Sequence, residues 1–84
     1  MEQVESRLWT AAVAETIRAE RAASRKTQAE VARAAGIPRV TYIRYETGER
    51  VPNLAKLIQI AGGLGMEFST FVARAEARVK EASK

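Results

Sequence analysis

Apolar positions recur along most of the chain at the three- and four-residue spacing of amphipathic α-helices. Residues 4–24 contain neither Gly nor Pro, and their apolar side chains fall at four-residue steps in two adjoining rows: Trp9, Val13 and Ile17, and beside them Val4, Leu8 and Ala12. The segment is also rich in Ala, Glu and Arg, which favour helix by intrinsic propensity. The pattern predicts one long helix with a broad buried stripe.

A second, shorter helix is predicted to begin after Thr27. A threonine followed three residues later by a glutamate, Glu30, is typical of a capping box, in which each side chain binds the other residue's backbone N–H. The inner face of this helix is then Val31, Ala32 and Ala35. Gly36 is expected to end it in a left-handed conformation that few other residues tolerate.

A third helix is predicted directly after this glycine. Pro38 suits the first helical position, because its missing N–H needs no partner there. Ile37, Tyr42 and Tyr45 are expected to point inward, and the chain then turns at Thr47-Gly48. Residues 27–46 therefore form two short helices separated by one glycine turn.

Two further helices complete the pattern. The fourth begins near Asn53 and ends at Gly65, and its Gly62-Gly63 pair weakens the helix while allowing close packing. Its expected buried face is Leu54, Leu57, Ile58 and Ala61. The fifth covers residues 68–81 and carries Phe68, Phe71, Val72, Ala75 and Val79. We therefore expect an all-α fold of five helices in a single domain, residues 1–84.

Composition narrows the range of functions. With 84 residues, the chain can build one small core and no more,. Because Cys, His and Asp are all absent, disulfides, zinc fingers and the usual proton shuttle are excluded, and no pair of the remaining Glu, Lys, Tyr and Ser side chains is placed as a catalytic site,. We expect no enzyme activity, metal or cofactor. The apolar runs are too short for a membrane span, and the acidic N-terminus is unlike a signal peptide, so a cytoplasmic protein is expected.

The net charge of +4 lies entirely in one part of the chain. Residues 18–50 hold eight Arg and Lys against four Glu, whereas the remaining residues hold six of each sign. A basic surface attracts phosphates and releases their counterions. The placement of the excess on and beside residues 27–46 indicates a nucleic-acid binder.

From about Ile17 to Phe71, and most clearly at residues 27–46, the chain resembles the phage repressor/Cro, or xenobiotic-response-element, type of helix-turn-helix. The resemblance implies a lambda-repressor-like fold whose third helix enters the major groove of double-stranded DNA. At the family's base-reading positions stand Arg39, Val40 and Arg44, with Ile43 adjacent, and helical spacing independently puts these four on one face. Arginine reads guanine through O6 and N7, and aliphatic side chains pack on thymine methyls, although readout of DNA shape is an open alternative.

The resemblance also assigns residues around this helix. Gln28 at the start of the second helix is a phosphate-binding candidate, and so are Thr41, Arg50 and Asn53. Arg21 and Glu46 match a buried structural ion pair of the family. Two departures are visible: Arg25-Lys26 replaces the usual Gly-Leu before the second helix, and Pro38 replaces a Ser or Thr cap.

We infer a sequence-specific transcriptional regulator, a repressor or autoregulator that binds a palindromic operator as a homodimer. Two interpretations of the last helix stay open, because the 4-3-4 spacing of Phe68, Val72, Ala75 and Val79 fits either a dimer interface or packing on Leu8 and Trp9 of the same chain. The alternatives are an antitoxin that binds its own operator and a toxin protein, and a restriction–modification controller. Neighbouring toxin, methylase or nuclease genes would distinguish them.

Overall fold

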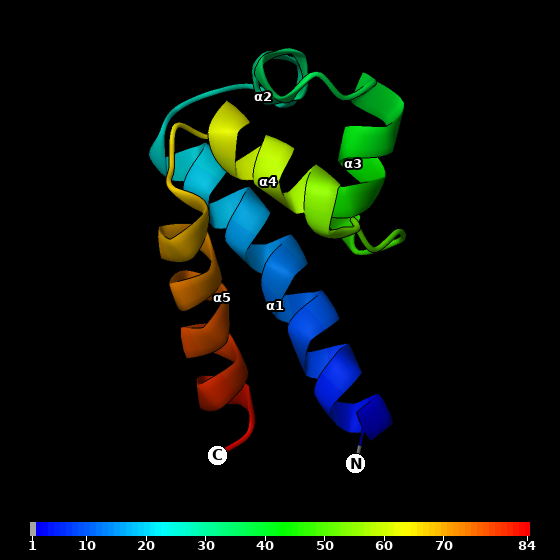
Figure 1. The fold of residues 1–84 in the computed structure, drawn as a ribbon, viewed down its shortest axis with the longest axis vertical. Helices are drawn as coiled ribbons and strands as arrows, with labels where there is room; N and C mark the ends of the chain where they lie inside the picture. The colour runs from blue at the N-terminus through cyan, green and yellow to red at the C-terminus, as the bar shows by residue number, and fades with distance from the viewer. Residues whose placement is uncertain (1) are drawn as a thin grey trace.

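The computed structural model describes residues 2–84 and the side chains of residues 5–84, so the predicted contribution of Val4 to the first stripe lies outside the described side chains. Within these residues the structure has no strand and five helices: α1 (Glu2–Ala23), α2 (Gln28–Ala35), α3 (Arg39–Thr47), α4 (Leu54–Gly63) and α5 (Phe68–Ala82) (Figure 1). The expected all-α fold of five helices is confirmed. Among the helices described, none combines the length and apolar character needed to cross a membrane.

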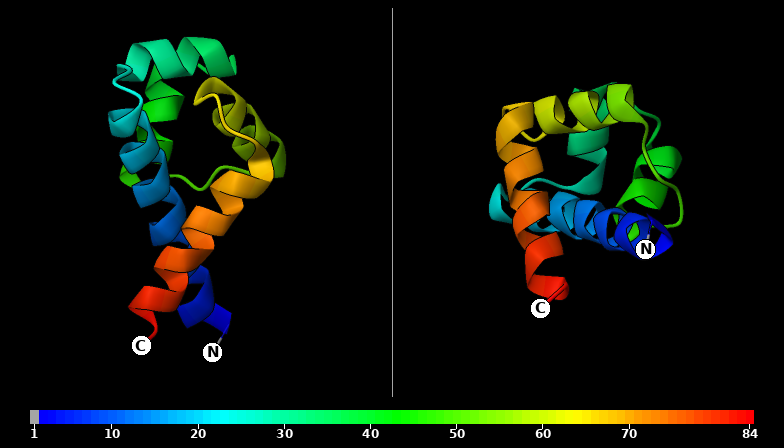
Figure 2. Two further views of the ribbon diagram at one scale, coloured as in Figure 1. Left: turned by 90° about the vertical axis from the view of Figure 1, so that its left-hand side faces the viewer. Right: turned by 60° about the horizontal axis from the view of Figure 1, so that its bottom comes forward.

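The two longest helices, α1 and α5, pack side by side, and both chain termini lie at the same end of this pair. Helices α2 and α3 lie at the opposite end of the molecule (Figures 1 and 2). Helix α4 packs against both α2 and α5, and α3 packs against α1 and α2. The helix pair α2–α3 therefore rests on a frame made by the other three helices.

One core joins all five helices, because each contributes a large side chain that is at most 1% exposed. These side chains are Ile17 of α1, Val31 of α2, Tyr42 of α3, Ile60 of α4 and Phe71 of α5. Full burial of a side chain of this size stabilises the fold by roughly 1.5–3 kcal/mol. Tyr42 of α3 thus belongs to one core that contains residues of every other helix.

The sequence signals around α2 and α3 are confirmed except for one detail. Thr27 and Glu30 form the capping box, with the Glu30 carboxylate accepting the Thr27 backbone N–H at 2.8 Å. Gly36 is left-handed at φ 73° and ends α2. Pro38 is the N-cap of α3 and not its first residue: its ψ of 138° lies outside the helical range, and helical geometry begins at Arg39.

The predicted buried face of α4 is confirmed for Leu57 and Ala61 but wrong for Leu54 and Ile58. Leu54 is 63% and Ile58 is 50% exposed, whereas Ile60, Ala61 and Leu64 are buried, with Leu57 packed partly against them. The two candidate stripes both follow helical spacing and share Leu57 and Ala61. Tertiary contact decides between them, because α2 and the core lie against the side of α4 that carries Ile60. The last helical residue is Gly63, with Leu64 as its C-cap, and the predicted Gly65 follows in the left-handed conformation (φ 74°) that terminates the helix,.

The turn between α1 and α2 shows the consequence of the Arg25-Lys26 sequence. Arg25 has a φ of 57°, the left-handed conformation that glycine adopts without strain. For a residue with a Cβ this conformation costs about 1–2 kcal/mol. The half-buried Lys26 side chain donates from Nζ to the Gly63 carbonyl at 3.4 Å.

Candidate nucleic-acid interface

Helix α3 leaves one face open to solvent and buries the other. On the open face, Val40 is 63% exposed, the Arg44 side chain is 48% exposed, Arg39 is exposed and Ile43 is half-buried. On the opposite face Tyr42 and Tyr45 are buried (0% and 6%). The four residues expected to read bases therefore share a surface that is accessible to a ligand.

The C-terminal end of α3 is held by an arginine that the sequence interpretation missed. The Arg18 guanidinium donates to the backbone carbonyl of Glu46, which is one of the last carbonyls of α3 and has no intrahelical partner,. A cation near a helix C-terminus also interacts favourably with the helix dipole. The signal was present in the spacing, since Arg18 lies one turn before Arg21 and so on the same face of α1.

Arg21 and Glu46 form a two-point ion pair that ties α1 to α3. Arg21 donates from Nε to Glu46 Oε2 at 2.6 Å and from Nη2 to Oε1 at 3.1 Å. The Arg21 side chain is 24% exposed and that of Glu46 only 3%. Gln28 at the start of α2 also donates its side-chain amide to Glu46 Oε1, at 2.9 Å. One carboxylate therefore links three helices.

The ionisation of this cluster follows from its contacts. Burial alone would raise the pKa of the Glu46 carboxyl, but the hydrogen bonds from Arg21 and Gln28 and the Arg21 charge hold that pKa below its ordinary value,. The hydrogen bond to Glu46 raises the pKa of Arg21. Burial raises the pKa of the neighbouring Tyr42 hydroxyl, and the Glu46 charge adds to the effect. The cluster is thus a charged pair beside a neutral phenol at neutral pH.

The four candidate phosphate ligands lie on segments that flank α3 or within it. Gln28 is the first residue of α2 and is half-buried through its bond to Glu46. Asn53 caps α4, where its Oδ1 accepts the Lys56 N–H at 2.9 Å. Thr41 is half-buried on α3, and Arg50 is exposed in the loop between α3 and α4. Contact of these residues with phosphate stays a prediction.

The loop after α3 carries a second residue that the sequence interpretation missed. Glu49 Oε2 lies 3.5 Å from Arg44 Nε, so one of the two arginines on the open face has an acidic partner. Among the described side chains, Arg39 has no carboxylate within 4 Å. Helical spacing could not reveal this pair, because the chain has left the helix at Gly48 before it reaches Glu49.

The α5 residues with 4-3-4 spacing are buried to different degrees. Ala75 is 1% exposed, and Phe68, Val72 and Val79 are half-buried. The two helices are also joined by Arg74 with Glu20 at 2.5 Å and by hydrogen bonding of Arg78 to Thr16 at 3.2 Å. This row of four residues, the α5 seam, therefore packs largely within the chain, although three of its side chains remain partly exposed.

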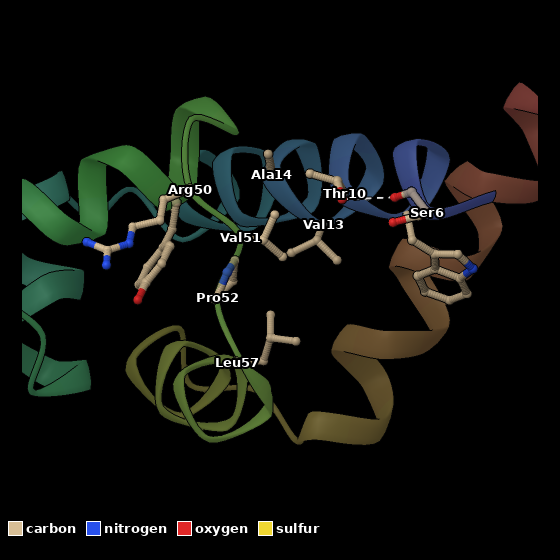
Figure 3. Close-up of a pocket in the computed structure, with 10 residues that line it drawn as sticks. Ser6, Thr10, Val13, Ala14, Arg50, Val51, Pro52 and Leu57 are labelled. Carbon is tan, nitrogen blue, oxygen red and sulfur yellow. Dashed lines mark hydrogen bonds between the residues drawn. The ribbon is translucent and has the colours of Figure 1, made fainter. Parts of the chain in front are cut away.

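An apolar groove of about 280 Å³ lies behind the loop between α3 and α4. Val13 of α1 and Leu57 of α4 project into it from opposite sides, and Val51-Pro52 crosses between them (Figure 3). Arg50 lines one end of the groove. The loop is thereby placed by packing on α1 and α4.

Comparison with known protein families gives one match. A family model described as helix-turn-helix matches residues 17–71, from the last two turns of α1 to the first turn of α5, and so includes all of α2, α3 and α4. No curated protein and no solved structure matches the chain. The matched region is the part of the chain that holds the open face of α3 and the Arg21–Glu46 pair.

Proposed function

Since this chain belongs to the helix-turn-helix family of the xenobiotic-response-element, lambda-repressor-like type, whose members are DNA-binding transcriptional regulators, we propose that it is a repressor or autoregulator that reads a palindromic operator as a homodimer. The observation that carries the proposal is the open face of α3, where two arginines and two aliphatic residues stand together. Two buried tyrosines hold the opposite face of that helix on the core.

The side chains of the open face suit base recognition in the major groove. Each arginine can donate two hydrogen bonds to guanine O6 and N7, and a good pair of this kind discriminates against the wrong base by roughly 1–3 kcal/mol. Val40 and the half-buried Ile43 offer apolar contact to thymine methyl groups. Gln28, Thr41, Arg50 and Asn53 would seat the helix on phosphates. Only Arg50 among them is charged, and a phosphate that it neutralises steepens the salt dependence by a log–log slope of about 0.9.

Substituting the arginines separately should change the DNA sequence that is selected. From a random duplex pool, Arg39→Ala and Arg44→Ala are each expected to lose preference at one base pair of each half-site, by about fivefold or more. Sequencing of the bound fraction measures this. Arg7→Ala is the matched control, because Arg7 is exposed on α1 at the end remote from α3. If both α3 variants select the wild-type consensus, the base-reading assignment is wrong.

A homodimer requires a contact surface, and α4 offers one. Leu54 and Ile58 lie one turn apart and leave half or more of each side chain in water, and Val51 just before them is 62% exposed. A single recognition helix covers few base pairs, whereas a two-fold dimer reads two half-sites about one DNA turn apart. Because Ala75 is already buried at the centre of the α5 seam, we place the contact between copies on the α4 surface of Val51, Leu54 and Ile58.

Substitutions on the two helices should separate the candidate surfaces. The double variant Leu54→Glu/Ile58→Glu is expected to be monomeric on a palindromic duplex in sedimentation velocity, because four like charges would face one another across a two-fold axis. The control variant Val72→Glu changes the half-buried α5 seam. A dimer that persists in the α4 variant but dissociates in the Val72 variant would assign the interface to α5. A wild-type monomer both free and on DNA would refute the dimer itself.

A further inference from the structure

We propose that Glu49 is a specificity-determining residue of the DNA-binding surface: its carboxylate orients Arg44 for one base and weakens binding to DNA that lacks that base. The inference rests on the proposed base reading by Arg44. It goes beyond that function by assigning a role to an acidic residue where the surrounding surface is basic. The observation behind it is the 3.5 Å contact between Glu49 Oε2 and Arg44 Nε.

Hydrogen bonds of the loop hold the backbone of Glu49 close to Arg44. The Thr47 hydroxyl donates to the Arg44 carbonyl at 3.1 Å, and the Glu49 backbone N–H donates to that hydroxyl oxygen at 3.4 Å. The Arg50 backbone N–H also donates to the Arg44 carbonyl, at 3.2 Å. The loop is thus folded back onto the backbone of the arginine that Glu49 contacts, so part of the entropy cost of ordering the pair is already met.

The geometry of the contact leaves the reading edge of Arg44 free. Guanidinium is planar and carries five N–H donors, distributed over Nε and the two terminal nitrogens. Glu49 lies beside Nε, so the edge formed by Nη1 and Nη2 can still donate to O6 and N7 of a guanine,. Glu49 therefore acts as a positioning residue that restricts the rotation of Arg44 without occupying the groups that read.

The charge of Glu49 has a second effect on any DNA. Its side chain is 67% exposed beside the face that approaches phosphates, so its repulsion of DNA applies to every sequence,. On a duplex without the matching guanine, Arg44 has Glu49 as its partner and contributes little attraction for phosphate. On the matching duplex the two hydrogen bonds to guanine offset the repulsion. The repulsion lowers affinity for every duplex alike, whereas the pairing of Arg44 with Glu49 costs affinity mainly on DNA without the guanine and so increases the ratio of specific to non-specific affinity.

Arg39 provides an internal comparison. It lies on the same open face of α3 but, among the described side chains, has no carboxylate within 4 Å. If Glu49 acts through Arg44, its removal should alter discrimination at the base pair that Arg44 reads and leave the Arg39 base pair unchanged. A general electrostatic effect would change both alike.

The test measures duplex affinities of the full chain by fluorescence anisotropy at one fixed salt concentration. The proteins are wild type, Glu49→Gln, Arg44→Ala and the double variant, with Glu81→Gln as the matched control. Glu81 undergoes the same charge change at the far end of α5, where its side chain is 77% exposed. The duplexes are the selected operator, two versions substituted at the base pair read by Arg44 or by Arg39, and an unrelated sequence.

For Glu49→Gln we expect affinity for the unrelated duplex to rise several-fold and discrimination at the Arg44 base pair to fall at least threefold, with no change at the Arg39 base pair. In the Arg44→Ala background the same substitution should leave discrimination unaltered. Wild-type discrimination in Glu49→Gln, or a uniform gain equal to that of Glu81→Gln, would overturn the inference. Unchanged base preference in Arg44→Ala would instead refute the proposed base reading on which it rests.

Discussion

Replacing Arg21 by methionine is expected to lower the free energy of unfolding by roughly 3–5 kcal/mol, because the substitution leaves the Glu46 carboxylate buried without its cation. Methionine keeps most of the apolar stem, so the loss reports the charge, its two hydrogen bonds to Glu46 and its bond to the Lys26 carbonyl rather than packing. The Glu46 side chain is 3% exposed and cannot turn to water without moving α3. A fall in Tm of about 12 °C or more follows for a domain of this size. Urea unfolding followed by the fluorescence of Trp9, the only tryptophan of the chain, measures the change.

Replacing the other partner, Glu46, should lower the free energy of unfolding by less. In Glu46→Gln the cation left behind is Arg21, whose side chain is 24% exposed and can be partly hydrated. The double variant Arg21→Met/Glu46→Gln should be more stable than the sum of the two single losses predicts, because neither charge is then left alone. The exposed pair of Lys84 with Glu81 is the control, and Lys84→Met is expected to change stability by less than about 1 kcal/mol,. Additive losses in the double variant would refute the coupling of Arg21 with Glu46.

The Arg21–Glu46 pair should also make the free energy of unfolding depend on pH. Because the folded-state pKa of Glu46 lies below its ordinary value of 4.5, the unfolded chain binds the proton first as the pH falls,. The contribution of Glu46 is therefore complete above about pH 4.5 and is lost as the pH drops through the lower, folded pKa,. In Glu46→Gln this part of the acid destabilisation should disappear.

Local signals in the sequence were sufficient for the elements of the motif. The capping box at Thr27 and Glu30, the left-handed Gly36 and the inward tyrosines all depend on interactions within a few residues, which one sequence displays directly. The open face of α3 was predicted for the same reason, since helical spacing decides which residues lie opposite Tyr42 and Tyr45. Helices α2 and α3 and the turn between them could thus be predicted from the sequence without knowledge of the rest of the fold.

Features that depend on partners distant in the chain could not be predicted in the same way. Two stripes of α4 had helical spacing, and only the placement of α2 and the core shows that Ile60 is buried while Leu54 and Ile58 are exposed. The contact of Glu49 with Arg44 requires the fold of a loop, which no periodic pattern encodes. For the site, the sequence therefore named candidate residues for reading DNA but not Glu49, which contacts one of them.

Replacing Gly63 by alanine is expected to lower the free energy of unfolding by up to about 3 kcal/mol, near the upper end of typical overpacking costs. A Cβ at this position would lie 2.9 Å from the Val31 carbonyl oxygen and 3.0 Å from the backbone nitrogen and Cβ of Ala35. These are mainly backbone atoms of α2, so no side chain can rotate away. Relief requires α2 and α4 to separate, and α2 carries the cap and the Gln28 contact that adjoin the recognition helix.

The neighbouring glycine supplies the matched control, because a Cβ at Gly62 would meet nothing within 4 Å. Alanine there is expected to stabilise α4 by up to about 1 kcal/mol through its higher helix propensity. The two substitutions are identical in chemistry and one residue apart, so opposite signs in urea unfolding would isolate the contact of α4 with α2. A Gly63→Ala variant as stable as Gly62→Ala would show that the two helices do not approach this closely. Loss of operator affinity in Gly63→Ala at a temperature where it remains folded would further indicate that this close approach sets the position of α2 under the DNA-binding face.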